Sequence, residues 1–377
     1  MPAPTLRTAV VGLLQGLENV YSTLHHPRYT LSALCDVSRR PWEWLTGERK
    51  IEDEGPEAAI FPHHIQWVKR SAAHPDFAAV EFTSDYDALL TREDIDAVIL
   101  VLPDVLHREY AVKALEAGKF VLSTKPMAAT VEDAFEIAAA ARKHTNHFML
   151  GFQLTYSPFT TTVLDIIASG EIGAPRVVRF DYHRGPWRPV HRRKYDEVDG
   201  AMRKEGGHWL DLFYRLSGQL PWRAISGFGA LDKPENDFEF EDNGILAIDY
   251  DGFRAAHSFT YFRDPLGEKE DFLLVGEKGL IRGDLERFTV DTDAGAREVV
   301  VPSKALPELY HTGYYEMHDE FAAMALDGRE PYTSWQTGLE NTLTSYAAQI
   351  AVAEGRTVQR GELADIDWRQ RFSDTKA

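Results

Sequence analysis

Over roughly the first 146 residues, short apolar runs alternate with amphipathic helical patterns. Two of the helical patterns cover residues 108–117, which end at Gly118, and residues 131–143. Strands buried on both faces are predicted at the apolar runs 8–14, 30–35, 97–102 and 120–123. Repetition of strand and helix predicts a doubly wound parallel sheet with right-handed crossovers, an α/β domain.

One stretch, residues 47–77, interrupts this rhythm and is interpreted as an insertion. It contains three prolines, a charged run and a short helical pattern near residues 65–71. It also carries three histidines, His63, His64 and His74, which raises the question of a metal site. No cysteine or organised carboxylate accompanies them at ligand spacing, so we expect a surface loop and no metal.

From residue 147 the pattern changes to runs of strands without intervening helices. Residues 176–183 alternate strictly, with Val178, Phe180 and Tyr182 on one side. Similar strands are predicted at residues 224–230, 244–250, 253–261, 272–275 and 288–290. This predicts an α+β domain over residues 147–377, built on an open, largely antiparallel sheet. The helical pattern near the end, around residues 339–350, is expected to pack back toward the N-terminal domain.

The bulk properties narrow the class of protein. A chain of 377 residues is long enough for two domains, and a net charge of −18 argues against nucleic acid as a partner. The single cysteine, Cys35, excludes an intramolecular disulfide, and no apolar run is long enough for a membrane span. We therefore expect a cytoplasmic protein that binds neither nucleic acid nor a membrane.

The first predicted strand runs into a glycine turn. Gly12, Leu14, Gln15 and Gly16 form it, and the next strand ends at Asp36. Such a turn lets backbone N–H groups approach a pyrophosphate, and an acid about 20 residues further on accepts the ribose hydroxyls, as in a Rossmann domain. The motif is imperfect because Leu14 stands at a glycine position. Asp36 favours NAD, whereas Arg39 and Arg40 could neutralise a 2′-phosphate and keep NADP open.

A more specific motif covers residues 102–126. It contains Leu102-Pro103-Asp104, His107, Ala114-Leu115-Glu116-Ala117-Gly118-Lys119-Phe120-Val121 and Thr124-Lys125-Pro126. Here the chain closely resembles the glucose–fructose oxidoreductase / inositol dehydrogenase family (Gfo/Idh/MocA). The resemblance continues through Gly151-Phe152-Gln153, residues 167–173, Gly207-His208-x-x-Asp211 and Val275-Gly276-x-x-Gly279, and covers nearly the whole chain apart from residues 47–77.

The resemblance implies roles for particular residues. Lys125 matches the lysine beside the nicotinamide and the reacting hydroxyl, and His208 matches the histidine that exchanges the hydroxyl proton. Implied cofactor contacts are Asp36, Pro103, His107, Thr124, Lys125 and Gln153 together with the glycine turn and Arg39, and implied substrate contacts include Tyr156 and His183. A homo-oligomer, a dimer or tetramer, is implied by the same analogy.

The chain departs from the family pattern at three positions. Thr124 replaces the glutamate of Glu-Lys-Pro, Leu14 replaces a glycine, and Lys204 takes the place of an acid four residues before His208. On a shared helix, Lys204 and His208 would lie on one face, where the lysine would act in the site and bind an anionic group. A solvent-exposed helix lysine is the alternative.

A strongly basic segment, residues 183–195, lies upstream of His208. Among its residues, Arg184 and Arg192 are candidates to hold an anionic substrate group, because a guanidinium grips two oxygens of a sulfonate or carboxylate. A solvated loop or a subunit contact is the alternative interpretation.

Three functions are consistent with these residues. The first is an NAD(P)-dependent oxidoreductase that acts on a secondary hydroxyl of a sugar, a polyol or a related, anionic compound. The second is an NAD-dependent glycoside hydrolase, which would work by transient oxidation, elimination and re-reduction on an anionic (sulfonated or carboxylated) glycoside. The third is a non-catalytic regulator, which the presence of both Lys125 and His208 disfavours.

Overall fold

Two compact units make up the computed structural model of the chain. One unit comprises Met1–Gly151 and Tyr314–Gly338, and the other comprises Phe152–Gly313 and Leu339–Ala377. The structure describes residues 4–54, 64–185, 201–204, 206–234, 240–261, 269–301 and 313–371. The division falls five residues after the predicted boundary at 146, and the segment Tyr314–Gly338 belongs to the first unit.

The first unit is built on a six-stranded parallel sheet with the strand order β3-β2-β1-β4-β5-β6. Its strands are β1 Leu6–Val11, β2 Tyr29–Cys35, β3 Glu81–Thr83, β4 Ala97–Leu100, β5 Phe120–Thr124 and β6 Phe148–Gly151. The doubly wound sheet is therefore confirmed. The strand order reverses between β1 and β4, and ligands of open α/β sheets bind beyond the carboxyl ends of the strands at such a point.

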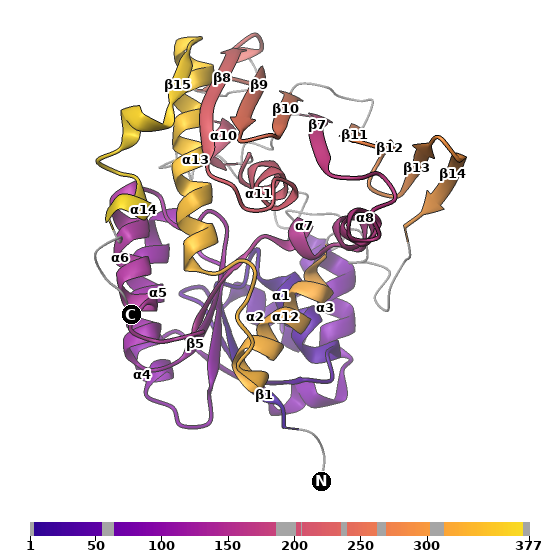
Figure 1. The fold of residues 1–377 in the computed structure, drawn as a ribbon. Helices are drawn as coiled ribbons and strands as arrows, with labels where there is room; N and C mark the ends of the chain where they lie inside the picture. The colour runs from indigo at the N-terminus through magenta and orange to yellow at the C-terminus, as the bar shows by residue number, and fades with distance from the viewer. Residues whose placement is uncertain are drawn as a thin grey trace. The chain divides into compact units, whose positions relative to one another are not determined.

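Helices cover both faces of this sheet, which explains why β4 is buried along its whole length. The principal ones are α1 Leu17–His25, α3 His64–Ala72, α5 His107–Glu116 and α6 Val131–Ala141 (Figure 1). The connection from β2 to β3 contains α2 Arg40–Thr46, η1 Ile51–Glu54, α3 and η2 Pro75–Ala79. The helix predicted near residues 65–71 is thus α3, which packs against α1.

Shorter elements complete the first unit: α4 Tyr86–Leu90, η3 Asp104–Leu106 and α12 Tyr314–Asp327. Helix α12 packs on α1 through a buried polar contact, because His318 Nε2 lies 3.1 Å from Asn19 Oδ1. The Tyr29 hydroxyl donates to the His318 carbonyl at 2.8 Å. These contacts fix a segment that is distant in sequence onto the first sheet.

A nine-stranded sheet forms the second unit, in the order β14-β13-β12-β11-β7-β10-β9-β8-β15. The strands are β7 Pro175–His183, β8 Trp222–Ala230, β9 Asn243–Tyr250, β10 Arg254–Thr260, β11 Lys269–Gly276, β12 Gly279–Gly283, β13 Arg287–Thr292, β14 Gly295–Val300 and β15 Thr357–Gln359. Strands β7 and β10 are parallel and the other described pairs are antiparallel. The predicted open, largely antiparallel sheet is confirmed.

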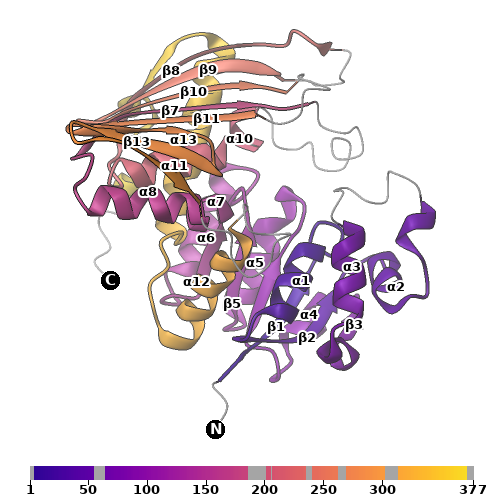
Figure 2. The same ribbon diagram turned by 90° about the vertical axis from the view of Figure 1, so that its right-hand side faces the viewer.

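One face of this sheet packs against helices. Figure 2 shows the sheet nearly edge-on, with α8 Pro158–Ala168, α11 Gly207–Leu216 and α13 Trp335–Glu354 on the same side. Val178, Phe180 and Tyr182 of β7 point into the core on that side, as the alternation predicted. On the other face, Phe228 of β8 is 62% exposed and lies opposite Ile245 of β9, which is 57% exposed.

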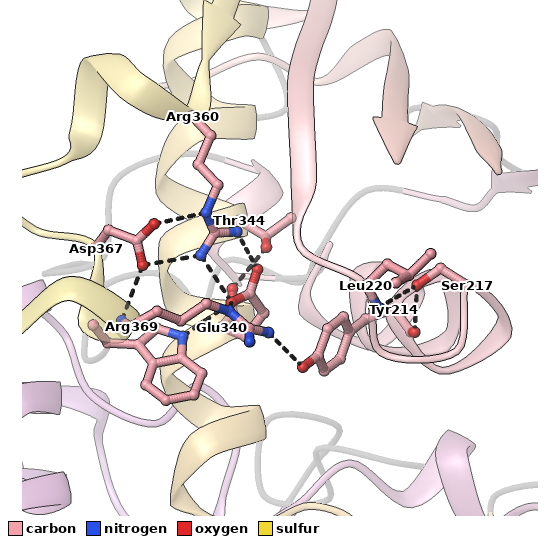
Figure 3. Close-up of polar contacts among 9 residues, drawn as sticks. Tyr214, Ser217, Leu220, Glu340, Thr344, Arg360, Asp367 and Arg369 are labelled. Atoms are coloured by element: carbon pink, nitrogen blue, oxygen red, sulfur yellow. Dashed lines mark hydrogen bonds and ion pairs between the residues drawn. The ribbon is translucent and has the colours of Figure 1, made fainter. Parts of the chain in front are cut away.

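The C-terminal segment is fixed to the second unit by a buried cluster of charges (Figure 3). The Glu340 carboxylate of α13 is 1% exposed and accepts hydrogen bonds from the Arg360 guanidinium, the Trp368 indole and Arg369. Arg360 also donates to Asp367 at 2.7 and 3.0 Å, and Arg369 donates to the Tyr214 hydroxyl of α11 at 3.0 Å. The cluster joins α11, α13, η5 Arg360–Leu363 and α14 Trp368–Arg371. Each charge is paired, which makes its burial tolerable.

We expect Glu340→Gln to lower the free energy of unfolding by about 3 kcal/mol, because it removes the buried carboxylate that the partly buried Arg360 and Arg369 share and leaves them with Asp367 alone. Asp94→Asn, which removes an exposed ion pair with Arg92, serves as the control and should cost less than about 1 kcal/mol. Urea denaturation of both variants measures the difference. Equal losses would show that the Glu340 cluster is no stronger than a surface pair.

Candidate active site

The glycine turn after β1 passes very close to the end of β4. Gly12 has a φ of +85°, and a Cβ added there would lie 2.0 Å from the carbonyl oxygen of Val101. Gly16, which begins α1, is equally restricted, because its Cβ would lie 2.1 Å from the Gly12 carbonyl oxygen. Only glycine fits at either position. Leu14 and Gln15 lie between them, half-buried, and the turn presents the N-terminus of α1 at the carboxyl edge of the sheet.

Asp36 follows β2 directly and its carboxylate reaches the glycine turn. Oδ2 accepts a hydrogen bond from the Leu13 N–H at 2.6 Å, and Oδ1 accepts one from the Ser38 N–H at 2.7 Å. The acid is therefore fixed beside the turn, where it can accept ribose hydroxyls and repel a 2′-phosphate. The Arg39 guanidinium lies 3.4 Å from the Glu48 carboxylate oxygen Oε1, and it packs over the Phe82 ring.

The ends of β4 and β5 carry the remaining predicted residues of the first unit. Lys125 follows β5 directly in a half-buried turn, and the Lys125-Pro126 peptide bond is cis. The Thr124 hydroxyl donates to the Leu100 carbonyl at 3.1 Å, so the threonine that replaces the family's glutamate attaches β5 to β4. Because β1, β4 and β5 are neighbours, Gly12, Pro103 and Lys125 all lie at one edge of the sheet.

His107 was predicted to contact the cofactor. Its imidazole is buried, with Nδ1 2.8 Å from the Pro126 carbonyl oxygen and Nε2 3.0 Å from the Leu102 carbonyl oxygen. The ring thus connects the loop after β4 with the turn after β5. No sequence pattern predicts this contact, since neither carbonyl leaves a signal in the sequence.

His208 lies in the first turn of α11 in the second unit. Its half-buried ring is edge-on to Phe152, with the centroids 6.1 Å apart. Asn341 of α13 donates to the carbonyl of the preceding Gly207 at 2.7 Å, so the backbone beside His208 is held by a residue distant in sequence. Sequence analysis did not find Asn341.

Helix α7, Gln153–Tyr156, is attached by polar contacts to α11, the helix that carries His208. Buried Asp211 accepts a hydrogen bond from the Thr155 hydroxyl, and burial raises the pKa of Asp211 to about 7. Arg215 donates to the Thr155 carbonyl at 2.8 Å, and its guanidinium lies over the Tyr156 ring. These contacts bring α7, with Gln153 and Tyr156, together with the helix that carries His208.

The two predicted substrate residues at the end of β7 point to opposite faces of the sheet. His183 lies on the outward face, where Nδ1 is 3.1 Å from the Thr260 hydroxyl. Arg184 lies on the side of α11, because it donates to the Tyr182 hydroxyl at 3.2 Å and the Tyr182 ring packs on Trp209 with centroids 4.9 Å apart. The structure therefore brings Arg184, but not His183, toward the helix of His208.

Two further predicted residues are less completely placed. Arg192 lies outside the described residues, and Lys204 is described only as the last residue of α10, Ala201–Lys204. Lys204 and His208 belong to different helices, since α10 ends at Lys204 and α11 begins at Gly207, and Glu205 between them lies outside the described residues. A Cβ on Gly206 would lie 2.7 Å from the Met202 carbonyl oxygen, so glycine is favoured at this position.

Comparisons with known proteins decide the family. Residues 62–152 match the family described as "Oxidoreductase family, NAD-binding Rossmann fold", and residues 160–282 match the "GFO/IDH/MocA C-terminal domain". The chain belongs to the Gfo/Idh/MocA family. It is an NAD-binding oxidoreductase of that family, as the glycine turn and the 102–126 motif predicted.

Several relatives share parts of this Gfo/Idh/MocA chain. The uncharacterized oxidoreductase YrbE of Bacillus subtilis is 27% identical over 297 residues, 73% of this chain and 81% of that protein. A dTDP-3,4-didehydro-2,6-dideoxy-alpha-D-glucose 3-reductase of Saccharopolyspora spinosa is 38% identical over 61% of this chain and 63% of its own length. A 2,7-anhydro-N-acetylneuraminate hydratase of Mediterraneibacter gnavus is 27% identical over 54% of each chain.

Solved structures share the fold at low sequence identity. An oxidoreductase from Agrobacterium radiobacter, in complex with NAD+, L-tartaric acid and magnesium, has a TM-score of 0.75 at 18% identity and covers 95% of this chain and 99% of that one. Apo scyllo-inositol dehydrogenase from Lactobacillus casei has a TM-score of 0.73 at 19% identity and covers 96% of this chain and 100% of its own. These likenesses agree with the two-part fold described above.

NAD is the cofactor of the first unit. The close approach at Gly12, the N-terminus of α1 and the fixed Asp36 carboxylate fit a dinucleotide without further change. In the described part of the chain, no group of three or more histidine, cysteine or acidic residues is arranged to hold a metal ion. His63 lies outside that part, whereas His64 is buried in α3.

Among the described helices, none is both long and apolar enough to cross a membrane. The cytoplasmic location stays a prediction.

We expect Gly12→Ala to reduce NAD affinity at least tenfold, because the methyl group cannot lie 2.0 Å from the Val101 carbonyl and the turn must move. Gly118→Ala is the matched control: Gly118 also has a positive φ, +73°, but its Cβ would meet nothing within 4 Å. Both variants carry similar backbone strain, so calorimetric titration with NAD separates strain from the close approach. Similar NAD affinities for the two variants would contradict this reading of the turn.

Proposed function

We propose that this protein is an NAD-dependent dehydrogenase for a secondary hydroxyl group of a sugar-like or polyol compound that carries a negative charge. The observation that carries the proposal is the position of Lys125, directly beyond β5 at the edge where Gly12 and Asp36 form the dinucleotide site. A lysine there can reach a substrate placed against the reactive end of the cofactor.

The two candidate catalytic groups have complementary chemistry. NAD, when bound, supplies the hydride acceptor. Lys125 would stabilise the negative charge that develops on the substrate oxygen, and an ammonium does so most effectively where water is scarce. His208, half-buried at the start of α11, would accept the hydroxyl proton through its imidazole.

The negative charge on the substrate is supported by Arg184. Its guanidinium contacts the Tyr182 hydroxyl, Tyr182 packs on Trp209, and Trp209 follows His208 in α11. Arg184 is therefore directed to the face of the sheet where the candidate proton acceptor lies. Lys204, the last residue of α10, and Arg192 would add positive charge. The hydratase relative is named for a neuraminate, the anion of a sugar acid.

A second candidate function is hydrolysis of an anionic glycoside with NAD as a catalytic, regenerated cofactor. The observation that favours it is the hydratase relative, whose name denotes addition or removal of water rather than net oxidation. Lys125 and His208 would serve both reactions, because proton removal from the same hydroxyl begins each of them.

We also propose that the enzyme is a homo-oligomer, a dimer or tetramer, assembled through the outward face of the nine-stranded sheet. Phe228 and Ile245 form an exposed apolar pair there, and Val177 of β7 adds a further apolar side chain at 41% exposure. Apolar surface of this kind is typical of contacts between subunits.

We expect Lys125→Ala and His208→Ala each to lower kcat roughly 100-fold or more, while NAD affinity changes by a few-fold at most. The measurement is a panel of anionic and neutral sugars and glycosides, with NADH absorbance and released aglycone followed together. A dehydrogenase accumulates NADH with product, whereas a hydrolase releases aglycone without net NADH. Near wild-type activity of His208→Ala would exclude it as the proton acceptor.

We expect Arg184→Ala, Lys204→Ala and Arg192→Ala to raise KM for the charged substrate more than they lower kcat. The expected penalty is roughly 1.5–3 kcal/mol for the charged form and almost none for an uncharged analogue. Arg297→Ala is the matched control, because Arg297 belongs to β14 of the same sheet and is exposed, where it pairs with Glu171 at 2.7 Å. Equal losses for charged and uncharged forms would mean that these residues support only the fold.

A further inference from the structure

The His107 side chain has an unusual set of acceptors. It is the first residue of α5 and is buried, yet its Nδ1 and Nε2 lie 2.8 Å and 3.0 Å from the carbonyl oxygens of Pro126 and Leu102. Both acceptors are backbone carbonyls, which cannot donate a hydrogen bond.

Counting the donors that these two contacts require indicates the charge of this ring. A neutral imidazole carries one N–H, so one of the two carbonyl oxygens would face a nitrogen lone pair at hydrogen-bond distance, a repulsive contact. An imidazolium carries two N–H groups and donates to both. Such charge-assisted bonds are also about twice as strong as neutral ones.

We propose that His107 is an imidazolium that donates to both carbonyls and thereby positions the turn carrying Lys125. The charge state follows from the contacts of the ring alone. The positioning role rests on the proposed function, in which Lys125 acts on the substrate. In this role His107 holds the turn from one side while the Thr124 hydroxyl, bonded to Leu100, holds it from the other.

Two other buried histidines of the chain give the comparison. His257 has one polar contact, from Nδ1 to the Phe180 carbonyl at 2.8 Å, and burial lowers its pKa to about 4. His318 has one such contact through Nε2, to Asn19, and burial lowers its pKa to about 3. The second nitrogen of each has no hydrogen-bond partner among the described residues. Both are neutral at pH 7, and His107 differs from them by its second carbonyl acceptor.

Two effects oppose a charge on His107, namely its burial and its place at the N-terminus of α5, where the helix dipole repels a cation. The two carbonyl dipoles offset them. The charged residues within three positions of His107 are Asp104 on η3 and Arg108 and Glu109 on α5, and Lys125 precedes the accepting Pro126. Arg108 is paired with Asp133 and Glu136 of α6, and Glu109 with Lys113. The result is a fixed positive charge at the dinucleotide edge.

The charge state is tested in the wild-type, full-length enzyme. Long-range proton–nitrogen correlation spectra of protein labelled with 15N-histidine distinguish an imidazolium, with two equivalent protonated-type nitrogens, from a neutral ring with two distinct ones. The signals of His107 are identified as those that disappear from the spectrum of His107→Gln. The signals of His257 are identified in the same way, from a His257 variant, and serve as the reference for a neutral ring. At pH 7 we expect the imidazolium pattern for His107 and the neutral pattern for His257. A neutral pattern for His107 overturns the proposal.

The positioning role is tested kinetically. Glutamine can reach one carbonyl at most, so His107→Gln should lower kcat on the order of 10- to 100-fold, with KM and NAD affinity within a few-fold of wild type. His147→Gln is the control: His147 stacks on Phe120 at the opposite end of β5, with centroids 4.2 Å apart, and its removal should leave kcat unchanged.

The outcomes are separable. An unchanged kcat in a His107→Gln variant that still binds NAD overturns the positioning role, and a parallel loss in His147→Gln reduces the effect to general loosening of β5. An active Lys125→Ala enzyme defeats the proposed function, while the charge on His107, measured by spectroscopy, stands independently.

Discussion

The dinucleotide site depends on one close approach, between Gly12 and the carbonyl of Val101. It lets the end of β1 pass against the end of β4 at the point where the strand order reverses. Everything else at that edge is arranged around it: Asp36 bonds back to the turn at Leu13, and the loops after β4 and β5 are joined through His107. A side chain at Gly12 would separate β1 from β4 and disperse these groups.

In the second unit the corresponding constraint is the satisfaction of buried polar groups. Asp211 is bonded by Thr155, Glu340 by two arginines and an indole, and the Gly207 carbonyl by Asn341. Each contact crosses between elements, so helix α11 is held by α7, α13 and α14 rather than by its own sequence. Buried polar groups require such partners, and here the partners fix the helix that carries His208.

The structure shows where two of the three departures from the family pattern, Thr124 and Lys204, lie. Thr124, which replaces a glutamate, keeps a hydroxyl that binds the neighbouring strand, so the turn after β5 is anchored without an acid. Lys204 is the last residue of α10, a different helix from the one that carries His208.

The sequence by itself determined the two-part architecture, the parallel and antiparallel sheets and the residues at the strand ends, because hydrophobic periodicity and glycine turns are local signals. Strands β3, β6, β12, β14 and β15 were not predicted. Of these, β3 and β15 have only three residues each, which is too few to show a period. The alternation along β7 had already placed His183 on the face opposite Tyr182. Only the tertiary structure decided which partners hold Arg184, His107, Asp211 and Glu340. Most of those contacts join residues far apart in the chain, and a backbone carbonyl or a buried carboxylate acquires its partner only when the elements pack.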